Sequence, residues 1–164
     1  MSDLAERSLT ITRRYSAPRA LVWQVWTDPA HLAAWWGPFG PERTTGTLDL
    51  TVGGRFEVIM HAPDGSAHPS RGVIKELVPE RRLVIEGDPQ APDACGAGLP
   101  PRAVVTVRFE DDAGGTRLTL DAVFVSEDAR AAARASGYEV SWRETLEALD
   151  GYLQRIPAAP EKQR

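Results

Sequence analysis

Tryptophans are concentrated where they could line a ligand site. Trp35 and Trp36 stand side by side before Gly37-Pro38, and Trp23 and Trp26 lie three residues apart. Indole rings bury a large area at little entropic cost and stack on flat or cyclic molecules. Trp35 and Trp36 could therefore wall a ligand pocket, or they could simply plug the core. We expect Trp26 in the core and Trp23 partly exposed.

Apolar residues alternate with polar ones along three later segments, which predicts strands with one buried face. That face should carry Phe56, Val58 and Met60, then Val105, Val107 and Phe109, and finally Leu118, Leu120 and Ala122. Methionine adapts to irregular shapes, so Met60 suits either a ligand surface or core filling. For residues 72–78 and 82–86 the alternation does not decide which side chains point inward.

These patterns predict a ligand-binding surface on the apolar strand face, the final helix and one helix end. Its expected members are Trp36, Phe56, Val58, Met60, Arg71, Val107, Phe109, Leu120, Tyr138, Trp142 and Thr145. Arg71 follows a proline near the start of a central strand. Its guanidinium could meet a ligand carboxylate or lie on the outer face, and we favour the outer face.

Two histidines flank the turn APDGSA and raise the question of a metal. His61 and His68 could approach each other across this hairpin. Zinc sites need three or four ligands, however, and the one thiol, Cys95, lies in a loop rich in proline and glycine. We therefore expect no metal and no other cofactor. His31, early in the second helix, should be solvated.

Motifs for covalent catalysis or phosphate binding are not evident. The sequence has no glycine-framed serine elbow, and Asp111-Asp112 occupies a turn, where short acceptor side chains help to reverse the chain. Gly53-Gly54 and Gly114-Gly115 belong to hairpins and precede no helix that could hold a phosphate. We lean against an enzyme.

Length and composition describe an ordinary globular protein. The 164 residues, 42% apolar and 26% charged, suit one domain with a core at about 8–156 and a polar tail at 157–164. Nineteen basic residues against twenty-three acidic ones give −4, and the basic residues are scattered, which argues against nucleic acid. With one cysteine, no signal-peptide pattern and no apolar run of about 20 residues, we expect a cytoplasmic protein without membrane insertion.

Helix signals occur at both ends of the chain. After a strand at 8–15, Ser16 should cap a short helix with Pro18 in its first turn, and Thr27-Asp28-Pro29 should start a second helix that Gly37-Pro38 ends. Ser126 should cap a final helix reaching about Ile156, in which Gly137 is a weak point. Spacings of three and four residues give that helix one strongly apolar face.

Between these helical parts the period becomes two, with turn residues about every ten positions. We expect strands at about 44–51, 55–62, 68–78, 81–87, 102–110 and 115–125, joined as an antiparallel meander, and a long loop at 87–101. The long helix must then cover the apolar face of the sheet. Since a curved sheet wrapped around a helix is not easily filled edge to edge, we expect a cavity between them, and such cavities are typical of small-molecule sites.

Five phrases carry a family resemblance over about residues 8–155. They are APRALVWQVWTDPAHLAAWWGP, VGGRFEVIMHAPDG, SRGVIKELVPERRLV, FEDDAGGTRLTL and SWRETLEALDGYL. In this order the chain resembles the START-like superfamily, and within it the Activator of Hsp90 ATPase homologue group. The resemblance implies an α+β helix-grip fold, also called START/Bet v1-like, with six to seven strands around a long C-terminal helix. Ser141 stands where the group often has glycine, which affects only where that helix bends.

Three functions follow from this interpretation. The first is binding of a small hydrophobic or aromatic molecule between the sheet and the final helix. The second, implied by the family name, is a partner of an Hsp90-type chaperone, although the best-known members use an additional domain, which we do not expect in this chain. The third is a cyclase or hydrolase, which would need an acid or base such as His61 or Glu57 inside the cavity. A homodimer is possible through open sheet edges and an exposed Trp23.

Overall fold

A computed structural model of the chain describes residues 5–36, 41–89 and 101–156. The strands are β1 (Ser8–Tyr15), β2 (Thr44–Leu48), β3 (Arg55–His61), β4 (Ala67–Val78), β5 (Arg82–Gly87), β6 (Val104–Asp112) and β7 (Gly115–Val123). The α-helices are α1 (Arg19–Thr27), α2 (Pro29–Trp35), α3 (Glu127–Ala135) and α4 (Tyr138–Arg155), and single 3₁₀ turns cover Ala5–Arg7 and Pro41–Arg43.

The described strands form one antiparallel sheet in the order β1-β7-β6-β5-β4-β3-β2. Strands β2 to β7 are the predicted meander, because each pairs with the next strand along the chain. Strand β1 joins the far side of β7, with Ser8 opposite Val123 and Tyr15 opposite Thr116. The expectation of six to seven strands is confirmed.

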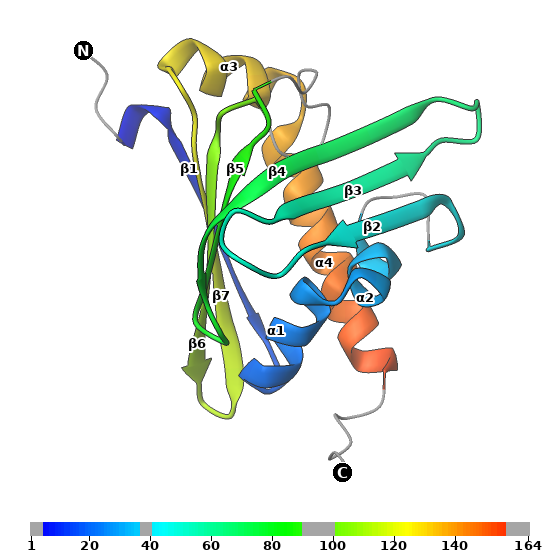
Figure 1. Ribbon diagram of the computed structural model, residues 1–164. Helices are drawn as coiled ribbons and strands as arrows, with labels where there is room; N and C mark the ends of the chain where they lie inside the picture. Colours follow the sequence, from blue (N-terminus) through cyan, green and yellow to red (C-terminus); the bar gives the residue numbers. More distant parts are fainter. Residues whose placement is uncertain (1–4, 37–40, 90–100, 157–164) are drawn as a thin grey trace.

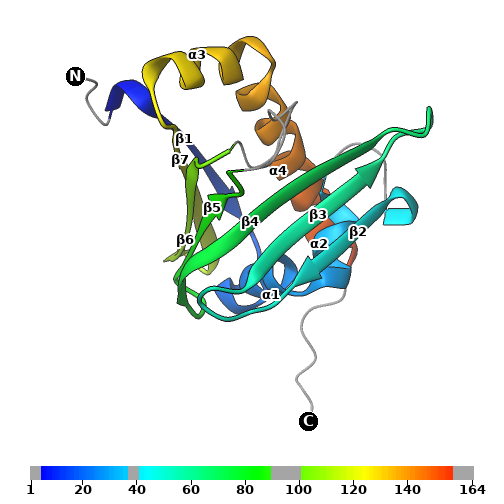
Figure 2. The ribbon, with the colours of Figure 1, turned by 45° about the horizontal axis from the view of Figure 1, so that its top comes forward.

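The sheet curves around α4, which runs across its inner side (Figure 1). Figure 2 shows α1 and α2 near one end of α4 and α3 at the other end. Side chains alternate between the buried inner face and the outer face along the strands, as in β6, where Val105, Val107 and Phe109 are buried. The buried inner face thus lies under α4 and under the two short helices.

The inward side of β4 and β5, which the sequence leaves open, is settled by the coordinates. Ile74 of β4 and Leu83 and Ile85 of β5 are buried. A register shift between Ile74 and Glu76 interrupts the alternation of β4, because one extra residue enters that strand. This bulge explains why simple alternation does not identify the buried face there.

The start of α1 differs from the prediction. Helix α1 begins at Arg19, and Pro18, not Ser16, is its N-cap residue, without a side-chain cap. The Pro18 carbonyl accepts the backbone N–H groups of Leu21 and Val22 at 3.0 and 3.1 Å. Serine at 16 lies too far upstream to reach the free N–H groups of the first turn, which belong to the residues just after the cap.

The second helix starts as predicted. The Asp28 carboxylate accepts the Ala30 N–H at 2.9 Å, and Pro29 occupies the first helical position. Helix α2 ends at Trp35. The predicted stop at Gly37-Pro38, most of the predicted loop at 87–101, Cys95 and the tail at 157–164 lie outside the described residues.

The predicted single final helix is wrong, because the chain breaks into α3 and α4 at Gly137. This glycine has φ +89°, a left-handed conformation that a helix cannot contain. The Ser126 hydroxyl caps α3 as expected, by accepting the Ala129 N–H at 3.0 Å. Helix α4 therefore takes its own direction across the sheet. No helix in the described segments is long and apolar enough to span a membrane.

Candidate functional site

The space between the sheet and α4 is occupied by a group of aromatic rings that we call the indole cluster: Trp26, Trp35, Trp36 and Trp142. Trp142 of α4 stacks on Trp26 of α1, with ring centroids 6.1 Å apart and planes 10° apart. Trp36, directly after α2, meets Trp142 edge-on at 5.0 Å and reaches Phe56 of β3 at 5.9 Å. Three helices and the sheet therefore converge on these rings.

Only one of the four indole N–H groups has an identified acceptor. Trp35 donates from Nε1 to the Val25 carbonyl at 2.9 Å. The Nε1 atoms of Trp26, Trp36 and Trp142 are buried and have no hydrogen-bond partner among the described residues. Each such donor lowers the stability of the fold by about 1–3 kcal/mol, because it has lost its hydrogen bonds to water and gained none in the protein. Three donors without acceptors in one cluster are unusual for a finished core.

The Tyr138 hydroxyl, at the start of α4, is a fourth buried polar group without a partner among the described residues. Its ring packs edge-on against Phe124 at 5.3 Å. Burial raises the pKa of Tyr138, and the neighbouring Trp142 indole offsets this slightly without reaching hydrogen-bond geometry. Tyr15 provides the contrast, because its equally buried hydroxyl donates to the Leu146 carbonyl at 2.8 Å.

Ten of the eleven predicted ligand-contacting residues are buried. They are Trp36, Phe56, Val58, Met60, Val107, Phe109, Leu120, Tyr138, Trp142 and Thr145. Arg71 is the exception: it lies on the outer face, where its guanidinium pairs with the Glu57 carboxylate. The preference for the outer face at Arg71 is thus confirmed, and it separates this residue from the interior set.

The interior is tightly closed around the indole cluster. Trp36 is 1% exposed, and Phe56 and Trp142 are 0% exposed, so these rings contact no water-sized space. Met60 and Thr145 keep 6% exposure. A guest molecule at this site would therefore have to displace side chains rather than enter an open chamber.

The titratable side chains buried in the described interior are the phenols of Tyr15 and Tyr138. No Asp, Glu, His, Lys or Arg is buried among the described residues. Glu57 lies on the outer face, and His61 is exposed. His68 faces Met60 across the hairpin while His61 faces Ala67, so the two histidines point to opposite faces. No group of three metal-ligating side chains occurs in the described residues.

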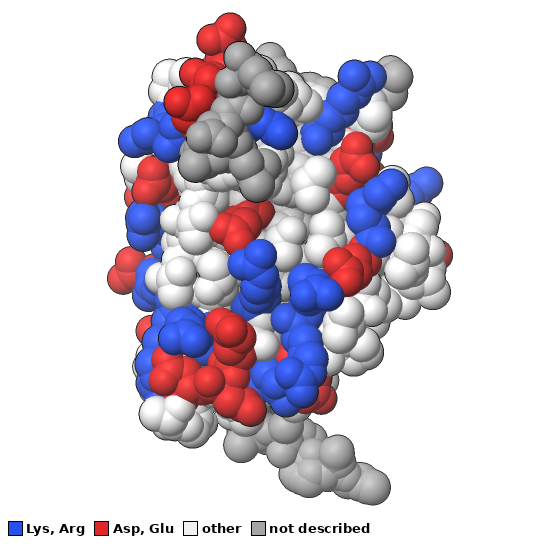
Figure 3. All heavy atoms as spheres, turned by 90° about the vertical axis from the view of Figure 1, so that its left-hand side faces the viewer, with Lys and Arg blue, Asp and Glu red and all other residues white. Residues whose placement is uncertain are grey.

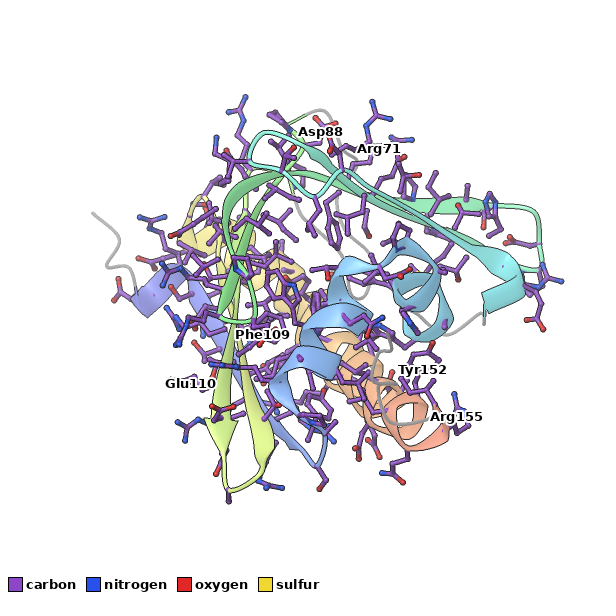
Figure 4. The ribbon with its side chains drawn as sticks, turned by 60° about the horizontal axis from the view of Figure 1, so that its bottom comes forward. Arg71, Asp88, Phe109, Glu110, Tyr152 and Arg155 are labelled. Atoms are coloured by element: carbon purple, nitrogen blue, oxygen red, sulfur yellow. The ribbon has the colours of Figure 1, made fainter. Side chains whose placement is uncertain are left out.

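His31 is not solvated as expected. Its Nδ1 atom lies 2.6 Å from the Tyr152 hydroxyl, and the two rings meet edge-on. The contact joins α2 to the C-terminal half of α4 beside the indole cluster, and the Arg155 guanidinium lies over the Tyr152 ring (Figure 4). No local pattern signals this pair, because its members are 121 residues apart. Trp26 was assigned to the core from its spacing, which does not disclose that its N–H lacks an acceptor.

An antiparallel sheet of seven strands that grips a C-terminal helix, with two short helices after the first strand, is the helix-grip fold of START-like proteins. The profile of the family described as Activator of Hsp90 ATPase homolog 1-like protein matches residues 16–154. The chain belongs to this family.

Solved structures agree with this assignment. A crystal structure from Nitrosomonas europaea is 25% identical, with a TM-score of 0.76 and coverage of 92% of this chain and 96% of that one. A solution structure from Arthrobacter aurescens is 26% identical, with a TM-score of 0.75 over 100% and 95% of the chains. An Aeromonas hydrophila protein whose title calls it AHSA1-like is 22% identical, with a TM-score of 0.68 over 90% and 92%. No curated protein matches the chain.

Proposed function

We propose that the chain binds a small, mainly apolar or aromatic molecule that carries a hydrogen-bond acceptor, in the interior beside α4. The observation that supports this most strongly is the set of three buried indole N–H groups without acceptors. An indole N–H can only donate, so a ligand carbonyl, ether or carboxylate oxygen would satisfy it. The Tyr138 hydroxyl could donate or accept at the same site.

Apolar burial would supply most of the affinity. The buried apolar cluster that includes the three indoles also contains Phe56 and Val58 of β3, Val107 and Phe109 of β6, and Leu120 of β7. Burial of apolar area contributes about 25 cal/mol per Å², and one or two polar contacts set the orientation. The combination favours a flat or cyclic molecule with a single oxygen group.

Entry requires the indole cluster to loosen. Trp36 lies at the end of α2, a helix of only seven residues, and contacts Trp142 of α4. Met60 has a flexible side chain that can move aside. The ligand would therefore bind with displacement of rings, and we expect slower association than for an open pocket.

The absence of a buried carboxylate, imidazole or amine in the described interior favours binding over catalysis, and nothing in the described residues favours an Hsp90-type partner over a small ligand. We place this binding in the cytoplasm, because one cysteine allows no internal disulfide. A chemically inert carrier is the function that these observations support best.

A matched pair of probes tests the proposal. 2-Acetylnaphthalene and 2-ethylnaphthalene have nearly the same shape, but only the first carries a carbonyl oxygen. At 100 times its dissociation constant a ligand stabilises the fold by about 2.7 kcal/mol, which corresponds to roughly 5–10 °C in Tm for a domain of this size. We expect the acetyl compound to raise Tm clearly more than the ethyl compound.

The variant Trp142→Phe keeps an aromatic ring but removes one N–H donor. In this variant the Tm shifts caused by the acetyl and ethyl compounds should differ less than in the parent protein. Protein taken directly from cells should also carry a co-purifying small mass in native mass spectrometry. If a broad panel of aromatic compounds leaves Tm unchanged and no such mass is found, the proposed binding is wrong.

A further inference from the structure

The outer face of the sheet carries a hollow, on the side away from α4. It has a volume of about 560 Å³ and is lined by Gly53, Arg55, Glu57, Arg71, Gly72, Val73 and Asp88. This size lies within the usual range for small-molecule sites. Arg71 and Asp88 lie on this outer side (Figure 4). The hollow shares none of its residues with the indole cluster, so it is independent of the function proposed above.

The walls of the hollow are fixed by backbone contacts. The turn before β3 docks on β4, because the Gly53 N–H donates to the Ile74 carbonyl at 2.7 Å and the Ile74 N–H donates to the Gly54 carbonyl at 2.9 Å. A Cβ atom at Gly54 would lie 2.1 Å from the Asp49 carbonyl oxygen, so only glycine fits there. On the other side the Asp88 N–H donates to the Arg71 carbonyl at 2.9 Å.

One row of side chains across the hollow carries a net negative charge. Glu57 of β3 lies opposite Arg71 of β4 and is ion-paired with it. Asp88 continues the pairing beyond Gly87 on the other side of Arg71. One guanidinium between two carboxylates leaves the row with one negative charge.

The next row supplies an available positive charge and an apolar floor. Arg55 of β3 lies opposite Val73 of β4. Arg55 is exposed, and no hydrogen bond or ion pair of its side chain occurs within the described residues. Val73 is 41% exposed, which makes it one of the few large apolar side chains open to solvent. Elsewhere on the outer surface, acidic and basic side chains alternate as exposed pairs (Figure 3).

The geometry points to a ligand with one charge of each sign. The four charged lining residues sum to zero, so neither an anion nor a cation alone is matched to the whole hollow. Arg55 and Glu57 are two residues apart on one strand, which separates their positions by about 7 Å. The two ends of an extended dipeptide are separated by a similar distance, at most about 3.3–3.6 Å per residue.

We propose that this hollow binds a short peptide, about two residues long, through both of its free ends. Its carboxylate is held by Arg55 through the two parallel hydrogen bonds that a guanidinium can donate, and its ammonium group lies against the Glu57 carboxylate, which Arg71 also contacts. An apolar side chain of the peptide covers Val73.

NMR titration of the full chain tests this with three probes that share the same two side chains: Leu-Leu, N-acetyl-Leu-Leu without the ammonium charge, and Leu-Leu-amide without the carboxylate. We expect Leu-Leu to shift the amide signals of Gly53, Gly72, Val73 and Asp88 in a saturable way. Each blocked peptide should bind at least about tenfold more weakly, because it loses one charge-assisted contact. Free leucine should also bind more weakly, because it is too short to reach both ends.

The variant Arg55→Gln removes an exposed charge without a described partner, so the fold should be unchanged, and Leu-Leu affinity should fall at least about tenfold. Arg117→Gln is the matched control, since Arg117 is an exposed arginine of the outer face paired with Glu110. It should leave the affinity unchanged. The proposal is overturned if Leu-Leu causes no saturable shifts at the hollow, if a blocked peptide binds as tightly, or if the two variants behave alike.

Discussion

Two tyrosines with equal burial but different hydrogen bonding allow a direct test of the unpartnered interior groups. Tyr15 and Tyr138 are both 0% exposed. The Tyr15 hydroxyl donates to the Leu146 carbonyl, while the Tyr138 hydroxyl has no partner among the described residues. Replacement by phenylalanine removes only the oxygen in each case, so both variants keep the ring and its packing.

The expected effects on stability have opposite signs. Loss of the Tyr15 hydrogen bond should lower the free energy of unfolding by about 1 kcal/mol. Tyr138→Phe removes a buried hydroxyl that has lost its hydrogen bonds to water and gained none in the protein. Burial of such an unpaired group costs about 1–3 kcal/mol. We expect Tyr138→Phe to be neutral or more stable than the parent, by up to about 1 kcal/mol, so the two variants should differ by about 1–2 kcal/mol.

Urea unfolding at pH 7 measures both changes, provided that the slope of the free energy against urea is the same in all three proteins. If Tyr138→Phe loses as much stability as Tyr15→Phe, the Tyr138 hydroxyl is hydrogen-bonded in the folded protein. The Trp142 indole would then be its partner, and the argument from unmet donors and acceptors would fail at this end of the cluster.

Two further effects on stability are expected. Gly137→Ala should lower stability by about 1 kcal/mol, because φ is +89° at this position. Gly151→Ala, within α4, should be neutral or raise stability by up to about 1 kcal/mol. Equal effects of the two substitutions in thermal unfolding would contradict the helix break at Gly137. Burial raises the pKa of Tyr15 and Tyr138, so above pH about 10 the unfolded chain loses protons that the folded chain keeps. Stability should fall there by about 1.4 kcal/mol per pH unit for each tyrosine, and urea midpoints of Tyr138→Phe should show a weaker dependence.

The meander could be predicted from sequence because its signals are local. Alternating apolar residues mark each strand, and turn residues such as Asp64-Gly65 mark each reversal. The observed strands start and end within a few residues of the predicted positions. The packing of the meander against the final helix also follows, because the apolar face needs a cover.

Features that depend on three-dimensional context were missed. Gly137 looked like a weak point within one helix, but whether glycine weakens a helix or ends it depends on the path that the following segment must take across the sheet. The sequence predicts that Ser16 caps α1 with Pro18 in the first turn, whereas Pro18 itself is the N-cap residue, and local composition does not locate the first helical residue that closely. The contact of His31 with Tyr152 requires α2 and α4 to meet, which no local pattern encodes.

In the candidate sites, too, some features follow from local sequence patterns and others only from the assembled structure. Burial of Trp142 follows from the amphipathic spacing of the final helix, whereas the sequence leaves Trp36 open between pocket wall and core. The lack of acceptors for both N–H groups is a property of the assembled interior. Likewise, Arg71 was recognised as an outer-face candidate, but its position between Glu57 and Asp88 depends on the register of three neighbouring strands.

The pairing of β1 with β7 has a consequence for how the chain folds. Strand β1 is made first, yet its partner ends at Val123, so almost the whole domain must be synthesised before the two can meet. Contacts between such distant segments are slow to form, because a large loop must close first. During synthesis the strand that carries Leu9 and Ile11 therefore stays unpaired until β7 has been made. A circular permutant that links the C-terminus to the N-terminus and opens the chain between β1 and α1 places β1 after α4, closer in sequence to β7. It should refold faster without altering the finished sheet.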